Sequence, residues 1–183
     1  GDIRPYLDTA WTVALLRSLI LTVILILSAP LVAAFFNAPE AKPIVQVMSF
    51  TVLLSGLRNI GIVYFQKDLE FHKRFVLQAG GTLSNIVVAI PAALLLRNAW
   101  ALVFGSLAAT LVGVVLSYLL HPYRPRPRLE WSRARDLYKF GFWTGGSSIL
   151  AYFVLNINEL VVGRMLGVGA LGVYLIVGLF WPL

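Results

Sequence analysis

The sequence predicts an all-α protein, a polytopic bundle of transmembrane helices, from three observations. Its 183 residues are 59% hydrophobic and only 13% charged, whereas soluble domains are about 45–50% apolar and about 25% charged. The apolar residues form runs of about 20, the length that crosses a hydrocarbon layer of about 30 Å. These runs do not alternate with a period of two, which disfavours the strands of a membrane barrel.

The first two predicted spans are Trp11–Phe36 and Ile44–Tyr64. Nothing charged follows Arg17 in the first span, and Arg17 itself lies near enough to its start to reach the interface. The turn Asn37–Pro43 contains two prolines and separates the two spans. The second span is more polar than the first, and a charged loop, Gln66–Arg74, follows it.

The third and fourth predicted spans are Phe75–Leu96 and Ala99–Leu120, joined by the short turn Arg97–Asn98. We expect Pro91 to kink the third span, with neighbouring helices satisfying the freed carbonyl. Small residues recur every four positions on the fourth span: Gly105, Ala109, Gly113 and Ser117. Such a face lets another helix backbone approach closely, so it predicts helix packing.

The fifth predicted span is Phe140–Val162, and Ala170–Leu183 begins a sixth after the glycine-rich turn Gly163–Gly169. Small and polar residues share one face of the fifth span: Gly141, Gly145, Ser148, Tyr152, Asn156, Glu159 and Gly163. A polar face in a membrane helix must point at protein or water. The chain does not begin with Met and its last apolar run stops abruptly, so we expect a piece of a longer protein.

A basic stretch, His121–Lys139, separates the fourth and fifth spans. Its basic residues are Arg124, Arg126, Arg128, Arg133, Arg135 and Lys139, against which stand only Glu130 and Asp136. Because loops rich in Lys and Arg stay in the cytoplasm, this stretch predicts a cytoplasmic linker. It divides the chain into residues 1–120, the linker at 121–139, and residues 140–183.

Several classes of function are disfavoured by the composition. The net charge of +7 is explained by membrane orientation, and no basic face is interleaved with base-stacking aromatics, so we expect no nucleic-acid partner. There is no cysteine, and His72 and His121 are far apart in the chain, so we expect no metal and no cofactor. No catalytic constellation stands out, so we expect no enzyme and no catalytic residue.

Polar residues inside the spans are the candidates for substrate contact. They are Ser55, Arg58 and Asn59 in the second span, Gln78 and Asn85 in the third, and Tyr152, Asn156 and Glu159 in the fifth. Those of the second and third spans are expected to line a hydrated cavity. Arg58 suits an anion through its paired donors, or it reaches the interface instead. Glu159 is an intramembrane carboxylate, or it is solvated or paired with Arg164.

Five stretches, taken in order, resemble the Wzx-like polysaccharide flippases of the multidrug/oligosaccharidyl-lipid/polysaccharide export superfamily. They are APLVAAFFNAPEA, LLSGLRNIGIVYFQKDLEFHKRF, NAWALVFGSLAATLV, YRPRPRLEWSRARDLYKFG and NINELVVGRMLGVGALGVY. The resemblance implies a two-lobed transporter of which this chain holds helices three to seven and the start of helix eight. Residues 1–120 would then belong to the first lobe, and residues 140–183 would begin the second.

The resemblance also implies a function. Such a transporter flips an undecaprenyl-diphosphate-linked oligosaccharide across the bacterial inner membrane by alternating access, for polysaccharide or lipopolysaccharide biosynthesis. It works as a monomer, among membrane lipids, with glycosyltransferases and a polymerase. The alternatives are another exporter of the superfamily, for drugs or a peptidoglycan precursor, and a membrane-embedded polysaccharide enzyme.

One position departs from the family pattern. Where the family often has Asp, five residues before its Gly-Arg pair, this chain has Asn158, followed directly by Glu159. Either Glu159 replaces that carboxylate from a shifted angle, or the position is structural. The resemblance therefore adds Asn158 to the candidate site.

Overall fold

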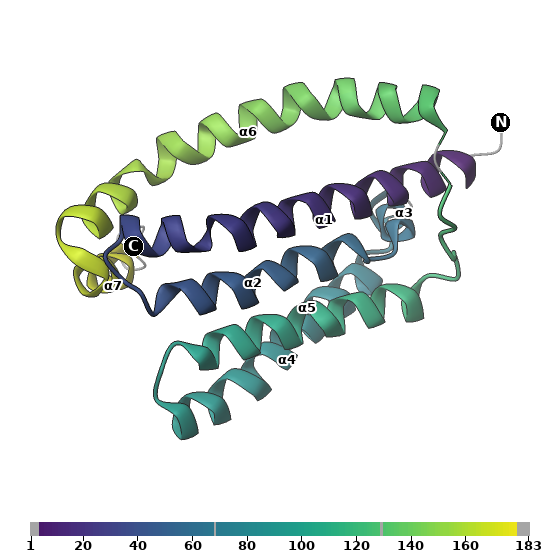
Figure 1. Ribbon diagram of the computed structural model, residues 1–183. Coiled ribbons are helices and arrows are strands. Elements are labelled where there is room, and N and C mark those ends of the chain that lie inside the picture. Colours follow the sequence, from purple (N-terminus) through teal and green to yellow (C-terminus); the bar gives the residue numbers. More distant parts are fainter. Residues whose placement is uncertain (1–3, 68, 129, 179–183) are drawn as a thin grey trace.

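The computed structural model describes residues 4–67, 69–128 and 130–178. The described chain is helical and without strands, which confirms the predicted all-α class (Figure 1). Its elements are α1 (Arg4–Phe35), α2 (Ala41–Gly56), the 3₁₀ turn η1 (Ile60–Ile62), α3 (Val63–Lys67), α4 (Phe71–Leu96), α5 (Trp100–Leu120), α6 (Trp131–Met165) and α7 (Gly167–Gly178).

The polytopic architecture is confirmed, since four helices of the described chain are long and apolar enough to cross a membrane. They are Tyr6–Phe35, Phe71–Leu96, Trp100–Leu120 and Gly145–Met165. The predicted second span, Ile44–Tyr64, is not one continuous helix. α2 has 16 residues, about 24 Å at about 1.5 Å per residue, which is short of the hydrocarbon thickness.

Asn59 explains why the predicted second span breaks. Its backbone is extended, with φ −63° and ψ 119°, and its side-chain oxygen accepts a hydrogen bond from the Gly61 N–H. An Asn side chain that bonds its own backbone two residues on competes with the helix. The chain therefore leaves α2 after Gly56, turns, and continues in η1 and α3.

Two predicted loops are shorter than expected. α2 begins at Ala41, so Pro43 lies in its first turn, where the missing N–H of proline costs nothing. α4 begins at Phe71, so the last residues of the predicted charged loop are helical. Pro91 lies within α4.

The predicted linker is half extended and half helical. His121–Glu130 has no regular structure where it is described, and α6 begins at Trp131. The side chains of Arg133, Asp136 and Lys139 lie outside the described residues, as does the predicted sixth span beyond Gly178. The turn between α6 and α7 is tight, with Gly167 at φ +86°, a conformation that favours glycine.

The long helices lie side by side in the order α6, α1, α2, α5, α4 (Figure 1). α1 pairs with α2, and α4 pairs with α5. Small residues dominate the buried core, which includes Ala29, Ala33, Ala101 and Val103. Many large apolar side chains are exposed, for example Leu31 at 72% and Leu95 at 83%, as suits surfaces that face lipid or further helices.

The face of small residues on α5 packs as predicted. A Cβ on Gly105 would lie 2.7 Å from the Ala89 Cβ and 2.7 Å from Asn85 Oδ1, both on α4. Gly105, Gly113 and Ser117 are buried. Close backbone approach thus holds α4 against α5, and this hairpin positions the polar side chains of α4.

Candidate functional site

A cavity of about 630 Å³ lies between α4, α5 and the segment that joins α2 to α3. Apolar residues form much of its wall. Its polar lining consists of Arg58, Arg74, Gln78, Thr82, Asn85 and Thr110. Because ligand sites are concave and mostly apolar with a few convergent polar groups, this cavity is the candidate site.

The spacing of polar residues on α4 creates one wall of the cavity. Arg74, Gln78, Thr82 and Asn85 follow one another at intervals of four, four and three residues. These intervals place side chains on one face of a helix. The wall therefore offers a guanidinium near the start of α4, then amide and hydroxyl groups along the helix.

Arg58 forms the other basic part of the cavity. It lies in the break after α2, not within a helix as predicted. Its guanidinium rests on α5, since a Cβ on Gly113 would lie 2.6 Å from Arg58 Nη2. Arg58 Nε is buried and has no hydrogen-bond partner among the described residues. A buried charged donor without an acceptor is costly, so this atom suits an anionic ligand.

Arg74 is the charged residue of the cavity that was not among the predicted candidates. The sequence predicts a charged loop there, but Arg74 lies in the first turn of α4 and lines the cavity. The signal was present in the sequence, since Arg74 stands four residues before Gln78. Extending the polar face of the third span one turn back would have found it.

Of the three predicted candidates of the second span, Arg58 lines the cavity and the other two do not. Gln78 and Asn85 line the cavity with Arg58, whereas Ser55 and Asn59 do not. Ser55 is exposed, and its hydroxyl donates to the Val52 carbonyl at 2.7 Å. Asn59 is fully buried and its Nδ2 donates to the Tyr123 carbonyl at 2.7 Å. Asn59 therefore joins the α2–η1 break to the linker.

The candidates on α6 do not line the cavity. Tyr152 is 63% exposed, and its carbonyl accepts a hydrogen bond from Asn156 Nδ2 at 2.8 Å. Asn158 is exposed and Glu159 is half-buried. Arg164, the possible ionic partner of Glu159, instead donates to the Phe35 carbonyl. This part of the predicted site thus lies apart from the cavity.

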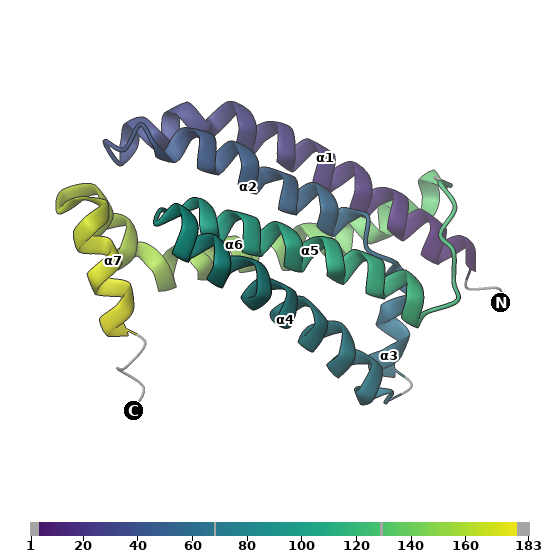
Figure 2. The ribbon, with the colours of Figure 1, turned by 90° about the horizontal axis from the view of Figure 1, so that it is seen from below.

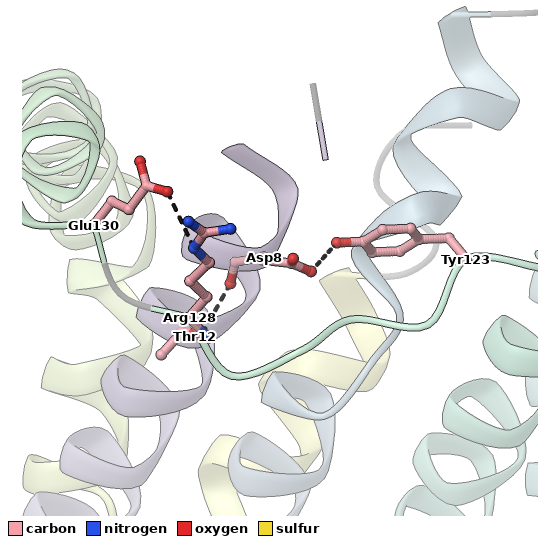
Figure 3. Close-up of polar contacts among 5 residues, drawn as sticks. All are labelled: Asp8, Thr12, Tyr123, Arg128 and Glu130. Atoms are coloured by element: carbon pink, nitrogen blue, oxygen red, sulfur yellow. Dashed lines mark hydrogen bonds and ion pairs between the residues drawn. The ribbon is translucent and has the colours of Figure 1, made fainter. Parts of the chain in front are cut away.

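The extended part of the linker is tied to the start of α1 (Figure 3). One carboxylate oxygen of Asp8 accepts hydrogen bonds from the Tyr123 hydroxyl and, at 3.0 Å, from the Arg126 N–H. Thr12 Oγ1 accepts from the Arg128 N–H at 3.1 Å, and Arg128 Nε pairs with Glu130 at 3.1 Å. The side chains of Arg124, Arg126 and Arg128 remain exposed.

The chain is similar to known proteins over most of its length. The model of a family described as polysaccharide biosynthesis protein matches residues 3–178. The chain is 27% identical over 164 residues to the lipopolysaccharide biosynthesis protein WzxC of Escherichia coli strain K12, covering 85% of this chain and 32% of that protein. No solved structure matches the chain.

Two further relatives are similar over much of the chain. The succinoglycan biosynthesis transport protein ExoT of Rhizobium meliloti strain 1021 is 26% identical, covering 78% of this chain and 29% of that protein. The teichuronic acid biosynthesis protein TuaB of Bacillus subtilis strain 168 is 22% identical, covering 92% and 35%. The chain therefore spans about a third of the length of the curated relatives it matches.

Proposed function

The chain belongs to the polysaccharide biosynthesis protein family, and on that premise we propose that it is part of a flippase for lipid-linked oligosaccharides. The substrate would be an undecaprenyl-diphosphate-linked repeat unit that crosses the membrane by alternating access of two lobes. The observation that carries this proposal is the cavity that gathers Arg58, Arg74, Gln78 and Asn85 within a membrane helix bundle.

The chemistry of the cavity fits both parts of such a substrate. Two guanidinium groups suit a diphosphate, because their paired donors match phosphate oxygens. The unpartnered Nε of Arg58 would gain an acceptor there. Amides and hydroxyls along α4 suit sugar hydroxyls, which both donate and accept hydrogen bonds. The apolar remainder of the wall needs no partner from the ligand.

The proposed orientation places the linker in the cytoplasm and the protein in the bacterial inner membrane. Figure 1 shows the linker at one end of the bundle and the α1–α2, α4–α5 and α6–α7 turns at the other. Few basic residues lie in or beside those three turns: Lys42, Arg97 and Arg164. The excess of arginine at the linker end supports this orientation through the positive-inside rule.

A reporter fusion tests this orientation. A reporter joined after Arg128 should behave as a cytoplasmic protein, whereas one joined after Asn98, in the α4–α5 turn, should behave as a periplasmic protein. A periplasmic signal from the Arg128 fusion would overturn the orientation and, with it, the cytoplasmic linker at residues 121–139.

The two-lobed organisation is part of the proposal. Residues 1–120 would form part of the first lobe, and residues 140–183 would begin the second. Transport needs no catalytic residue, and the name of one relative, a biosynthesis transport protein, supports transport over catalysis. We propose that the full-length protein works as a monomer with the glycosyltransferases that build the repeat unit and the polymerase that consumes it.

Substitution of Arg58 tests the proposed function. In the full-length protein, Arg58→Ala should lower repeat-unit export about tenfold or more, because a hydrogen bond to a charged group contributes about 1.5–3 kcal/mol and about 1.4 kcal/mol is a factor of ten. Export is measured as surface polysaccharide, and the amount of protein in the membrane is measured in the same cells.

Two control variants accompany Arg58→Ala. Arg17→Ala removes an exposed arginine of α1 that does not line the cavity, and it should export normally. Arg58→Lys keeps the charge but loses the paired donors, so its export should lie between the two. Normal export by Arg58→Ala, at a normal protein level, would remove Arg58 from the site and the proposal would lose its carrying observation.

A further inference from the structure

α6 and α1 are in contact, and one place where they meet is the end of the bundle opposite the linker (Figure 1). Here the residue pair Gly163–Arg164 of α6 meets Phe35 and Phe36 at the end of α1. We call these four residues the latch. Figure 2 shows the same end of the bundle from below, with α7 beside it.

Arg164 caps the C-terminus of α1. Its Nη1 donates to the Phe35 carbonyl at 2.6 Å, and its guanidinium lies 5.3 Å from the centre of the Phe35 ring. Phe35 is the last residue of α1, so its carbonyl has no donor within the helix. A cation is also favoured near the negative end of a helix dipole. The bond is therefore specific to this helix end.

Gly163 allows the two helices to come this close. It is buried, and a Cβ there would lie 2.8 Å from Phe36 Cε1 and 3.0 Å from Leu171 Cδ2. Other glycines of α6, at 141, 145 and 146, would meet nothing within 4 Å. Of the four glycines on α6, Gly163 is thus the closely packed one, and its absent side chain lets the Phe36 ring lie against the α6 backbone.

The middle of α6 is open to its surroundings in the described chain. From Gly146 to Leu155 every residue is exposed, with Leu155 at 78%. At the linker end, α6 is joined to α1 through the extended segment that Asp8 and Thr12 hold. A helix that is tethered at one end and held by a few contacts at the other can separate from its neighbour when those contacts break.

We propose that the latch closes the transporter at the end opposite the linker, and that Arg164 must leave the Phe35 carbonyl for that end to open. Arg164 is then a positioning residue for the conformational change, with no contact to substrate. The proposal rests on the proposed function, because only a transporter with two lobes needs this end to open and close.

A distance measurement on the full-length protein tests the latch directly. Spin labels are attached to cysteines introduced at Ala34 and Met165, two exposed positions beside the latch. Any other cysteine of the full-length protein is first replaced; the 183 residues of this chain contain none. In lipid nanodiscs without substrate, we expect a predominant short-distance population. Arg164→Ala and Gly163→Val should each lower that population at least twofold.

Matched variants separate the latch from general damage. Gly146→Val makes the same change on the same helix in open space, and Arg97→Ala removes an exposed arginine from the same end of the bundle. Both should keep the wild-type distances. Arg164→Lys keeps a donor and a charge and should restore part of the short-distance population. Gly163→Ala is a milder change, because the two atoms that it meets are the far ends of side chains.

If the distances in Arg164→Ala equal those of the wild type, the latch does not exist and the proposal fails. If they lengthen while surface polysaccharide stays normal, the contact is real but has no part in transport. If Arg58→Ala exports normally while the latch variants shift the distances, the proposed site fails and the latch stands.

Discussion

α5 and α6 carry the same kind of face and use it in opposite ways. Small residues recur every three or four positions on both helices. On α5, Gly105, Gly113 and Ser117 are buried. On α6, Gly141 is exposed and Gly145 is half-buried, and a Cβ on either would meet nothing within 4 Å. Apart from Gly163 in the latch, the same spacing therefore marks a packed interface in one helix and an open surface in the other.

The difference teaches that a face of small residues permits close approach but does not specify a partner. α5 meets α4, which is joined to it by a turn of a few residues, and Gly105 packs within this hairpin. Gly113 packs against Arg58, in the break after α2. α6 follows a long linker and contacts α1 at the latch. In the two-lobed transporter that we propose, the bare face of α6 would meet helices outside this chain.

A large side chain placed on each face should give the largest difference in stability between the two helices. Gly105→Leu would force a side chain into Ala89 and Asn85 of α4, and we expect it to lower the free energy of unfolding by about 3 kcal/mol. Gly145→Leu meets nothing at its Cβ and should be neutral or raise stability by up to about 1 kcal/mol, because Leu favours helix over Gly. Unfolding in detergent measures both. Equal losses would erase the contrast between the helices.

Removing a hydroxyl from the packed face should have a smaller effect. Ser117 Oγ accepts a hydrogen bond from the Asn59 N–H at 3.0 Å and donates to the Val114 carbonyl. Ser117→Ala would leave the buried Asn59 N–H unpaired, at a cost of about 1–2 kcal/mol.

The control for Ser117→Ala is Ser55→Ala. The Ser55 hydroxyl is exposed and bonds only within its own helix, so its loss should change the free energy of unfolding by less than about 0.5 kcal/mol. The same detergent unfolding experiment compares the two variants. A Ser117→Ala protein as stable as the wild type would show that α5 does not hold the α2–η1 break in place.

Loosening the linker should have the smallest effect on stability, and it tests how firmly the start of α6 is tied to α1. Asp8→Ala removes the acceptor of the Tyr123 hydroxyl and the Arg126 N–H. Losing these partly exposed hydrogen bonds should lower the free energy that holds the linker in place by about 1 kcal/mol. Trypsin cleavage after Arg128 should then be about fivefold faster. Arg124 and Arg126 precede prolines and are poor trypsin sites.

Asp8→Asn is the control for the linker, since it keeps an oxygen that can accept one of these hydrogen bonds. Its cleavage rate should lie near that of the wild type. If Asp8→Ala and the wild type are cleaved at the same rate, the linker is held by contacts other than those of Asp8.

Much of the fold follows from local pattern. The lengths of the apolar runs predicted α1, α4 and α5 to within several residues at each end, because a membrane span needs a minimum number of apolar residues whatever lies beside it. The polar face of α4 was predicted for the same reason, since Gln78 and Asn85 share one side of any helix that contains both. The packing face of α5 followed from its four-residue spacing.

Long-range contacts decided the rest, because they join residues that no local pattern relates. The break at Asn59 depends on two hydrogen-bond acceptors 58 and 64 residues away, the Ser117 hydroxyl oxygen and the Tyr123 carbonyl. Arg58 and Arg74 share a cavity because that break turns the chain back toward α4. The sequence alone thus sufficed for the class of protein, its spans and the chemistry of its polar faces. The folded chain decided which faces are covered and which arginines meet, because burial and pairing depend on the partner that tertiary packing brings into contact.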